Sequence, residues 1–92
     1  MQENAVSAVL KIKNVRGLHA RAAAAFARTA EEFDAEIAVE RKGQNVCGRS
    51  IMGLMMLGAA VGSEITVTCS GKQAKEALDA LEKLVDDKFH ED

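Results

Sequence analysis

The sequence predicts an α+β fold of the open-faced sandwich type, a four-stranded antiparallel sheet covered on one face by three helices. Two observations predict it. Short segments that alternate apolar and polar residues, as half-buried strands do, are interleaved with alanine- and leucine-rich segments of helical spacing. The expected order is β-α-β-β-α-β-α, with strands over 6–13, 36–40, 44–47 and 63–69 and helices over 20–33, 51–57 and from 72 onward. This pattern alone leaves a ferredoxin-like arrangement open.

The strands differ in how clearly they are marked. The segment 63–69 has the clearest alternation, with Ile65 and Val67 on one face and threonines on the other. The pair Lys42-Gly43 lies between the second and third strands, and a glycine there supplies the positive φ that a tight hairpin turn requires. We therefore expect these two strands to form a hairpin.

The helices are marked by apolar spacing and by one capping residue. In the first helix the core-facing residues are expected to be Phe26, Ala27, Ala30 and Phe33. In the last helix the apolar stripe is expected to comprise Ala74, Ala77, Leu78, Leu81, Leu84, Val85 and Phe89. The short helix between them begins after Ser50, which we expect to be its N-cap.

The composition excludes several classes of function. The chain has 92 residues, a net charge of −2 and only three aromatic residues, all phenylalanine. We expect a single domain over residues 1–92 and no nucleic-acid binding, because both basic charge and stacking platforms are lacking. The longest apolar run, over 51–61, contains two glycines and is too short to cross a bilayer. No secretory signal is evident, so we expect a cytoplasmic protein without membrane insertion.

The cysteines and histidines do not form a metal-ligand pattern. Cys47 and Cys69 lack metal-ligand spacing, and we expect reduced thiols packed as small buried hydrophobes, with a disulfide left open. His19 and His90 lie far apart in the sequence, so neither a metal site nor a cofactor is expected. His90, in the acidic tail, is expected to be a solvent-exposed terminal residue.

The most informative stretch surrounds His19. If the alanine-rich helix begins at Ala20, His19 occupies the N-cap position, next to the unpaired N–H groups of the first turn. That end of a helix carries partial positive charge and binds anions, and Arg21 adds a full charge with planar donors suited to phosphate oxygens. The helix end should also disfavour the protonated ring. A phosphoryl group could be held here; the alternative is a simple polar residue at a helix start with an exposed arginine beside it.

Two motifs give the chain a family resemblance. Gly17-Leu18-His19-Ala20-Arg21 resembles the active-site motif of HPr, the histidine-containing phosphocarrier of the bacterial phosphotransferase system. The segment 49–57 resembles the family's regulatory-serine segment and the short helix that follows it. The resemblance runs over about residues 6–85 and implies the fold described above. One departure is Ala22, where most members have proline; the nitrogen-related branch of NPr type also replaces that proline.

The resemblance implies specific roles around His19. Nδ1 of His19 would accept a phosphoryl group from enzyme I and pass it to enzyme IIA domains, with Arg21 and the backbone amides of Ala20 and Arg21 binding the phosphate. The protein would then be a stoichiometric carrier rather than an enzyme. We expect a monomer.

The resemblance also implies a docking surface and a regulatory site. Ser50 would be the substrate of an HPr kinase/phosphorylase. The expected partner-binding residues are Arg28, Arg49, Ile51, Met52, Met55 and Met56. The apolar members of this set cannot all share one face of a short helix, so some should be exposed; the alternative is that the methionines pack inside.

Two other functions remain open at this stage. One is a regulatory protein of the nitrogen branch, which acts through phosphorylation-dependent partner binding at Ser50 and the methionine-rich surface. The other is a small-ligand domain with ferredoxin-like topology. Neither explains why His19 and Arg21 occur together at a helix start.

Overall fold

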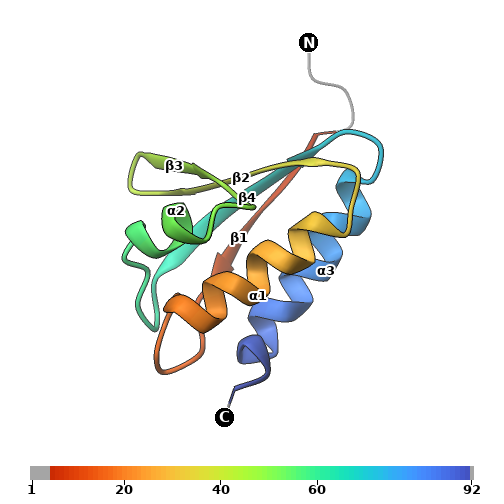
Figure 1. The fold of residues 1–92 in the computed structure, drawn as a ribbon. Helices are drawn as coiled ribbons and strands as arrows, with labels where there is room; N and C mark the ends of the chain where they lie inside the picture. The colour runs from red at the N-terminus through yellow and green to blue at the C-terminus, as the bar shows by residue number, and fades with distance from the viewer. Residues whose placement is uncertain (1–4, 92) are drawn as a thin grey trace.

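The computed structural model describes residues 5–91, which form a four-stranded sheet with helices on one face (Figure 1). The strands are β1 (Val6–Lys11), β2 (Glu36–Arg41), β3 (Gln44–Cys47) and β4 (Glu64–Ser70). The helices are α1 (Ala20–Glu31), α2 (Ile51–Met56) and α3 (Ala74–Asp86), followed by a 3-10 turn η1 (Lys88–His90). The predicted α+β class and the order β-α-β-β-α-β-α are confirmed.

The order of strands across the sheet is β1-β4-β2-β3, with every neighbouring pair antiparallel. A ferredoxin-like sheet would have the first strand in its interior, whereas here β1 lies at an edge. The β2–β3 hairpin closes through Lys42 and Gly43, whose φ angles are 52° and 84°, the positive values that a two-residue hairpin turn needs.

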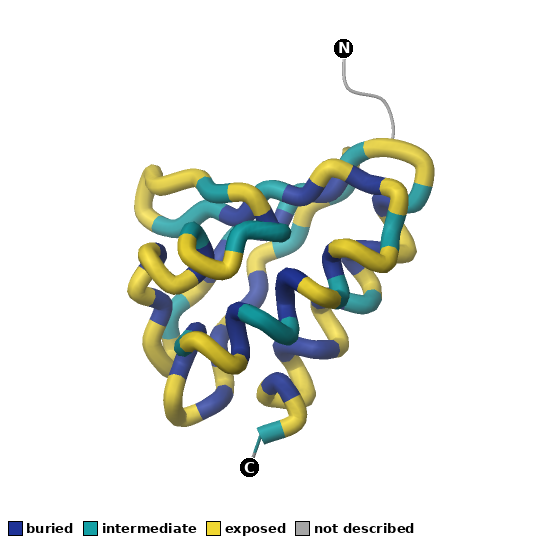
Figure 2. Tube along the Cα trace, viewed as in Figure 1, coloured by how far each residue is buried: buried dark blue, intermediate teal, exposed yellow. Residues whose placement is uncertain are grey.

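The core lies between the sheet and the pair α1 and α3, whose inward sides are buried (Figure 2). Phe26 of α1, Leu81 of α3, and Ile65 and Val67 of the central strand β4 belong to one core cluster, all four with 0% exposure. The apolar spacing of the sequence had assigned these residues to the core. With α1 and α3 packed on the sheet in this way, the start of α1 and the end of α3 lie at the same end of the molecule (Figure 1).

Element ends differ from the sequence expectation. Helix α1 ends at Glu31 rather than at residue 33, because its last turn tightens: the N–H of Glu32 bonds to the carbonyl of Thr29 at 3.1 Å. Phe33 is consequently only half-buried. Helix α3 ends at Asp86, so Phe89 does not continue its stripe, although Phe89 is buried.

The expectation that both cysteines are buried is correct for Cys69 and wrong for Cys47. Both are free, and Cys69 is buried in β4, where burial raises the pKa of its thiol. Cys47, however, is exposed. It lies on the edge strand β3, where Val46 packs against the core, so its neighbour Cys47 points to the uncovered face of the sheet.

Ser50 is the N-cap of α2, as predicted, and its Oγ accepts the N–H of Gly53 at 3.0 Å. We expect Ser50→Ala to lower the free energy of unfolding by about 1 kcal/mol, because a first-turn amide loses its acceptor. Urea denaturation measures this, with Ser50→Asp as the matched variant that keeps a capping oxygen and should retain stability. Equal stabilities of all three proteins would contradict a capping role.

Among residues 5–91, no helix has the length and apolar character needed to span a membrane.

Candidate functional site

His19 occupies the N-cap position of α1, as predicted. Its backbone is extended (φ −78°, ψ −177°), and its carbonyl accepts the N–H of Ala23 at 2.8 Å, the first bond of the helix. Helix geometry leaves the preceding N–H groups, those of Ala20, Arg21 and Ala22, without intrahelical acceptors. The imidazole is partly accessible, with 23% of its side-chain surface exposed. A nucleophilic ring therefore lies next to a positive helix end and within reach of solvent.

The loop before His19 is held by close backbone packing. Gly17 has a φ of +67°, and the N–H of the next residue, Leu18, donates to the carbonyl of Ala59 at 2.8 Å. A Cβ on Gly17 would lie 2.5 Å from that same carbonyl oxygen. Leu18 is buried, so the loop is anchored to the 58–60 segment directly before His19. Glycine is thus required both for the positive φ and for the close approach.

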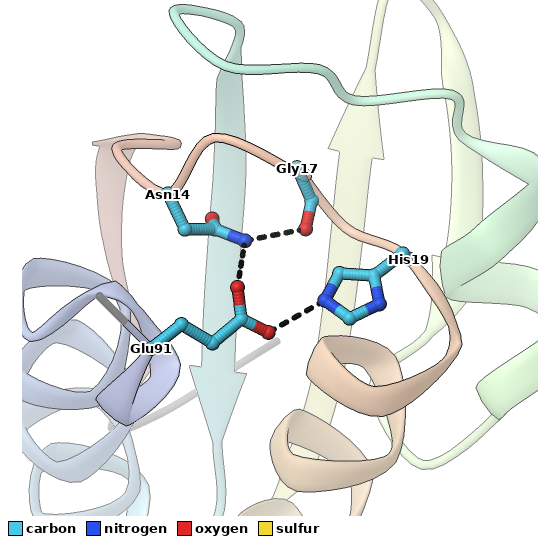
Figure 3. Close-up of polar contacts among 4 residues, drawn as sticks. All are labelled: Asn14, Gly17, His19 and Glu91. Carbon is cyan, nitrogen blue, oxygen red and sulfur yellow. Dashed lines mark hydrogen bonds and ion pairs between the residues drawn. The ribbon is translucent and has the colours of Figure 1, made fainter.

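Glu91, at the C-terminal end of the described chain, reaches the ring of His19 (Figure 3). Its Oε2 lies 2.5 Å from Nε2 of His19, and its Oε1 accepts a hydrogen bond from Nδ2 of Asn14 at 3.0 Å. The same Nδ2 donates to the carbonyl of Gly17 at 2.7 Å, and Asn14 is fully buried. The loop that carries Asn14, Gly17 and His19 is therefore joined to Glu91, which is 72 residues beyond His19 in the sequence.

The contact with Glu91 determines which ring nitrogen is available for chemistry. The hydrogen bond from His19 lowers the pKa of Glu91, and Asn14 and the charge of Arg21 act in the same direction, while burial opposes them. Glu91 is therefore ionised at neutral pH. A carboxylate only accepts hydrogen bonds, so Nε2 must carry the proton, and in the neutral ring Nδ1 is the nitrogen with the free electron pair. Nδ1 lies on the side of the ring away from Glu91 (Figure 3).

The lowered pKa of Glu91 predicts a pH dependence. Because the pKa in the folded state lies below the ordinary glutamate value, the contact stabilises the fold above that value, and this stability is lost as the pH falls through the lowered pKa. Carboxyl ¹³C NMR should give a midpoint for Glu91 below the usual range. In His19→Ala the midpoint should rise, since the largest cause is removed; identical midpoints in both proteins would contradict the assignment.

The segment that carries Glu91 has an unusual backbone. Lys88, Phe89 and His90 have φ angles of 56°, 55° and 63°, in the left-handed region. Each such residue costs about 1–3 kcal/mol unless other contacts hold it. Phe89 is buried with 6% exposure and Glu91 is bonded to two side chains, and these contacts hold the turn. His90 is exposed, as expected, but the role of Glu91 was not predicted.

Two arginines line hollows at this end of the molecule. Arg21 and Arg16 line a hollow together with residues 89–91, and Arg16 also lines a second hollow that contains His19 and the 58–60 segment. Arg21 is therefore placed on the Glu91 side of the ring, and Arg16 is the arginine that shares a hollow with His19. The sequence analysis did not predict Arg16 as a site residue, although its position three residues before His19 could have indicated it.

The comparisons with known proteins bear on this site directly. A family model described as the PTS HPr component phosphorylation site matches residues 6–87. The chain belongs to the HPr family. It is 42% identical to phosphocarrier protein HPr of Cupriavidus necator over 80 residues, which cover 87% of this chain and 90% of that protein. It is 46% identical to phosphocarrier protein NPr of Shewanella violacea over 80 residues, 87% of this chain and 88% of that protein.

The fold is that of HPr structures as well. The crystal structure of HPr-C-His from Thermoanaerobacter tengcongensis superimposes with a TM-score of 0.91 at 40% identity, covering 95% of this chain and 98% of that one. The chain is thus a member of the HPr/NPr phosphocarrier family of the phosphotransferase system.

In this HPr-family chain α2 exposes much of its apolar surface. The exposed fractions are 42% for Ile51, 68% for Met52, 39% for Met55 and 67% for Met56. Leu54, in contrast, is fully buried and faces the core. The expectation that the helix divides its apolar residues between two faces is confirmed, and the alternative that these methionines pack inside is wrong.

The two arginines expected to meet a partner differ in their surroundings. Arg28 is exposed in the last turn of α1. Arg49 is half-buried, and its Nη2 donates to the carbonyls of Phe33 at 3.1 Å and Ala35 at 2.8 Å. Arg49 therefore ties the α1–β2 turn to the start of α2, an internal role that the sequence did not indicate.

Proposed function

We propose that this protein carries a phosphoryl group on Nδ1 of His19, accepting it from the phosphohistidine of enzyme I and passing it to a histidine of an enzyme IIA domain. The observation that carries this proposal is the contact between Glu91 and Nε2 of His19 at the N-cap of α1. Because a carboxylate only accepts, the proton of the neutral ring belongs on Nε2, which leaves the electron pair of Nδ1 available. Because the phosphoryl group is received and given up again, the protein is a stoichiometric carrier and not a catalyst by itself.

The surroundings of His19 suit a reversible transfer. The positive end of α1 contributes about 0.3–1 kcal/mol, up to about 2 where partly buried, toward holding the anion. A charge-assisted hydrogen bond from Arg21 adds roughly 1.5–3 kcal/mol. With the amides of Ala20 and Arg21, these groups supply the positioning and charge stabilisation that phosphoryl transfer requires. Their sum stabilises the phosphorylated state without making it irreversible.

We assign docking to the exposed surface of α2, made of Ile51, Met52, Met55 and Met56. Flexible thioethers adapt to more than one partner, as a carrier that meets both a donor and an acceptor requires. Arg28 supplies positive charge for an acidic partner surface. Phosphate on Ser50, from an HPr kinase/phosphorylase, would add about −1.5 to −2 charge beside this surface and weaken docking on acidic partners.

A second candidate is a regulatory protein of the nitrogen branch, which acts mainly by partner binding that depends on phosphorylation of Ser50. It is favoured by Ala22 in place of the family's proline and by the similarity to a protein named NPr. The structure tolerates alanine here, because Ala22 is buried in the first turn of α1, where a good helix former fits. If this candidate is correct, His19→Ala leaves partner binding and its output intact.

The test is incubation with phosphoenolpyruvate and enzyme I, followed by intact-mass analysis. We expect a gain of one phosphoryl group that is labile in acid and stable in base. His19→Ala should gain none, while His90→Ala, the matched control at the other histidine, should behave as wild type. Phosphate that survives acid, or that persists in His19→Ala, would refute the carrier assignment.

A further inference from the structure

We infer that Glu91 is a positioning residue for this transfer: it holds His19 with the proton on Nε2 and balances the positive charge that the ring acquires when Nδ1 bonds to phosphorus. The inference rests on the proposed function and deepens it, because it assigns the choice of nitrogen to one named side chain.

The geometry fixes both oxygens of Glu91. Oε2 faces Nε2 of His19 at 2.5 Å, and Oε1 is held by the buried Nδ2 of Asn14 at 3.0 Å. The side chain of Glu91 is only 14% exposed, so water competes weakly for it. A carboxylate held at two points cannot rotate away without losing both bonds, and the imidazole orientation is fixed with it.

The electron and proton balance of the step explains why a carboxylate is useful here. The electron pair of Nδ1 forms the new bond to phosphorus, and the donor's ring nitrogen keeps the electron pair of the bond that breaks. The proton on Nε2 stays on His19 throughout. The ring of His19 therefore gains positive charge as the bond forms, and the negative charge of Glu91 opposes that cost. An imidazole between a carboxylate and a reacting atom works by the same principle in serine hydrolases.

The chain delivers Glu91 to this place through a conformation that L-residues avoid. Lys88, Phe89 and His90 all have positive φ, and burial of Phe89 anchors the turn. The charged groups around the carboxylate are Arg16 and Arg21, which line the hollow next to it together with His90. The two guanidinium groups offset the repulsion between Glu91 and an incoming phosphoryl group.

The test compares Glu91→Gln with Glu82→Gln, which removes an equal charge from the exposed face of α3. Imidazole ¹⁵N shifts of unphosphorylated His19 should show only the form with the proton on Nε2 in wild type and in Glu82→Gln. Glutamine can donate as well as accept, so Glu91→Gln should show both neutral forms. Its rate of phosphorylation by enzyme I should fall roughly tenfold, as expected when a charged partner of a hydrogen bond is made neutral.

A third variant, Glu91→Asp, keeps the charge and should recover part of the rate. The inference is overturned if Glu91→Gln keeps the single ring form, or if its rate equals that of wild type. The outcome is distinguishable from failure of the proposed function: if wild type accepts no phosphate at all, the carrier assignment fails, while the ¹⁵N comparison still reports whether Glu91 sets the ring form.

Discussion

Replacing Gly17 with alanine should lower the free energy of unfolding by about 2–4 kcal/mol, the sum of a left-handed backbone penalty and a steric clash. Gly17 has a φ of +67°, and an added Cβ would lie 2.5 Å from the carbonyl oxygen of Ala59 and 2.9 Å from Cα of Ala60. Both neighbours are backbone atoms, so neither can move aside as a side chain would. Urea denaturation measures the loss.

The same variant should displace His19, because Gly17 lies two residues before it. Gly62→Ala is the matched control: its φ is +88°, but a Cβ there meets nothing within 4 Å. It should therefore lose only the backbone part, about 1–2 kcal/mol, and keep its phosphorylation rate. If Gly17→Ala is no less stable than Gly62→Ala, the close packing that we assign to this loop is wrong.

Replacing Arg21 with alanine should slow phosphorylation by enzyme I roughly tenfold to hundredfold, because a charge-assisted bond to the phosphoryl oxygens is lost. Stability should change by no more than about 0.5 kcal/mol, since the side chain is exposed. Rapid-quench measurement at saturating enzyme I separates this rate from docking. The phosphorylation rate of Arg21→Lys should lie between those of wild type and Arg21→Ala, because lysine keeps a charge but not the planar pair of donors.

Lys72→Ala is the control for general loss of positive charge, since Lys72 is exposed in the connection between β4 and α3. That connection lies at the opposite end of the molecule from the start of α1 (Figure 1). This variant should be phosphorylated by enzyme I at the wild-type rate. A normal rate in Arg21→Ala, or an equal slowing in Lys72→Ala, would show that Arg21 does not act on the phosphoryl group.

Much of the fold could be predicted because it depends on local pattern. Alternation identified Ile65 and Val67 as core residues of β4, and both are fully buried. The change from a glycine-containing loop to an alanine-rich segment located the start of α1 at Ala20, which placed His19 at the N-cap. Ser50 was recognised as a cap by residue type alone. These features depend only on residues close in the sequence.

The missed features depend on residues that are distant in the sequence or on the sheet as a whole. Glu91 meets His19 across 72 residues, and no local signal shows that residues 88–90 turn left-handed. Phe89 was assigned to the helix because its spacing fits, yet it is buried from the turn that follows. Cys47 is exposed because β3 is an edge strand, which depends on the order of strands.

The most direct test of the central claim is NMR of the phosphorylated, ¹⁵N-labelled protein. We expect ³¹P–¹⁵N coupling to Nδ1 of His19, with the Nε2 proton still present and bonded to Glu91. Phosphate attached to Nε2 of His19, or to any other residue, would contradict the account.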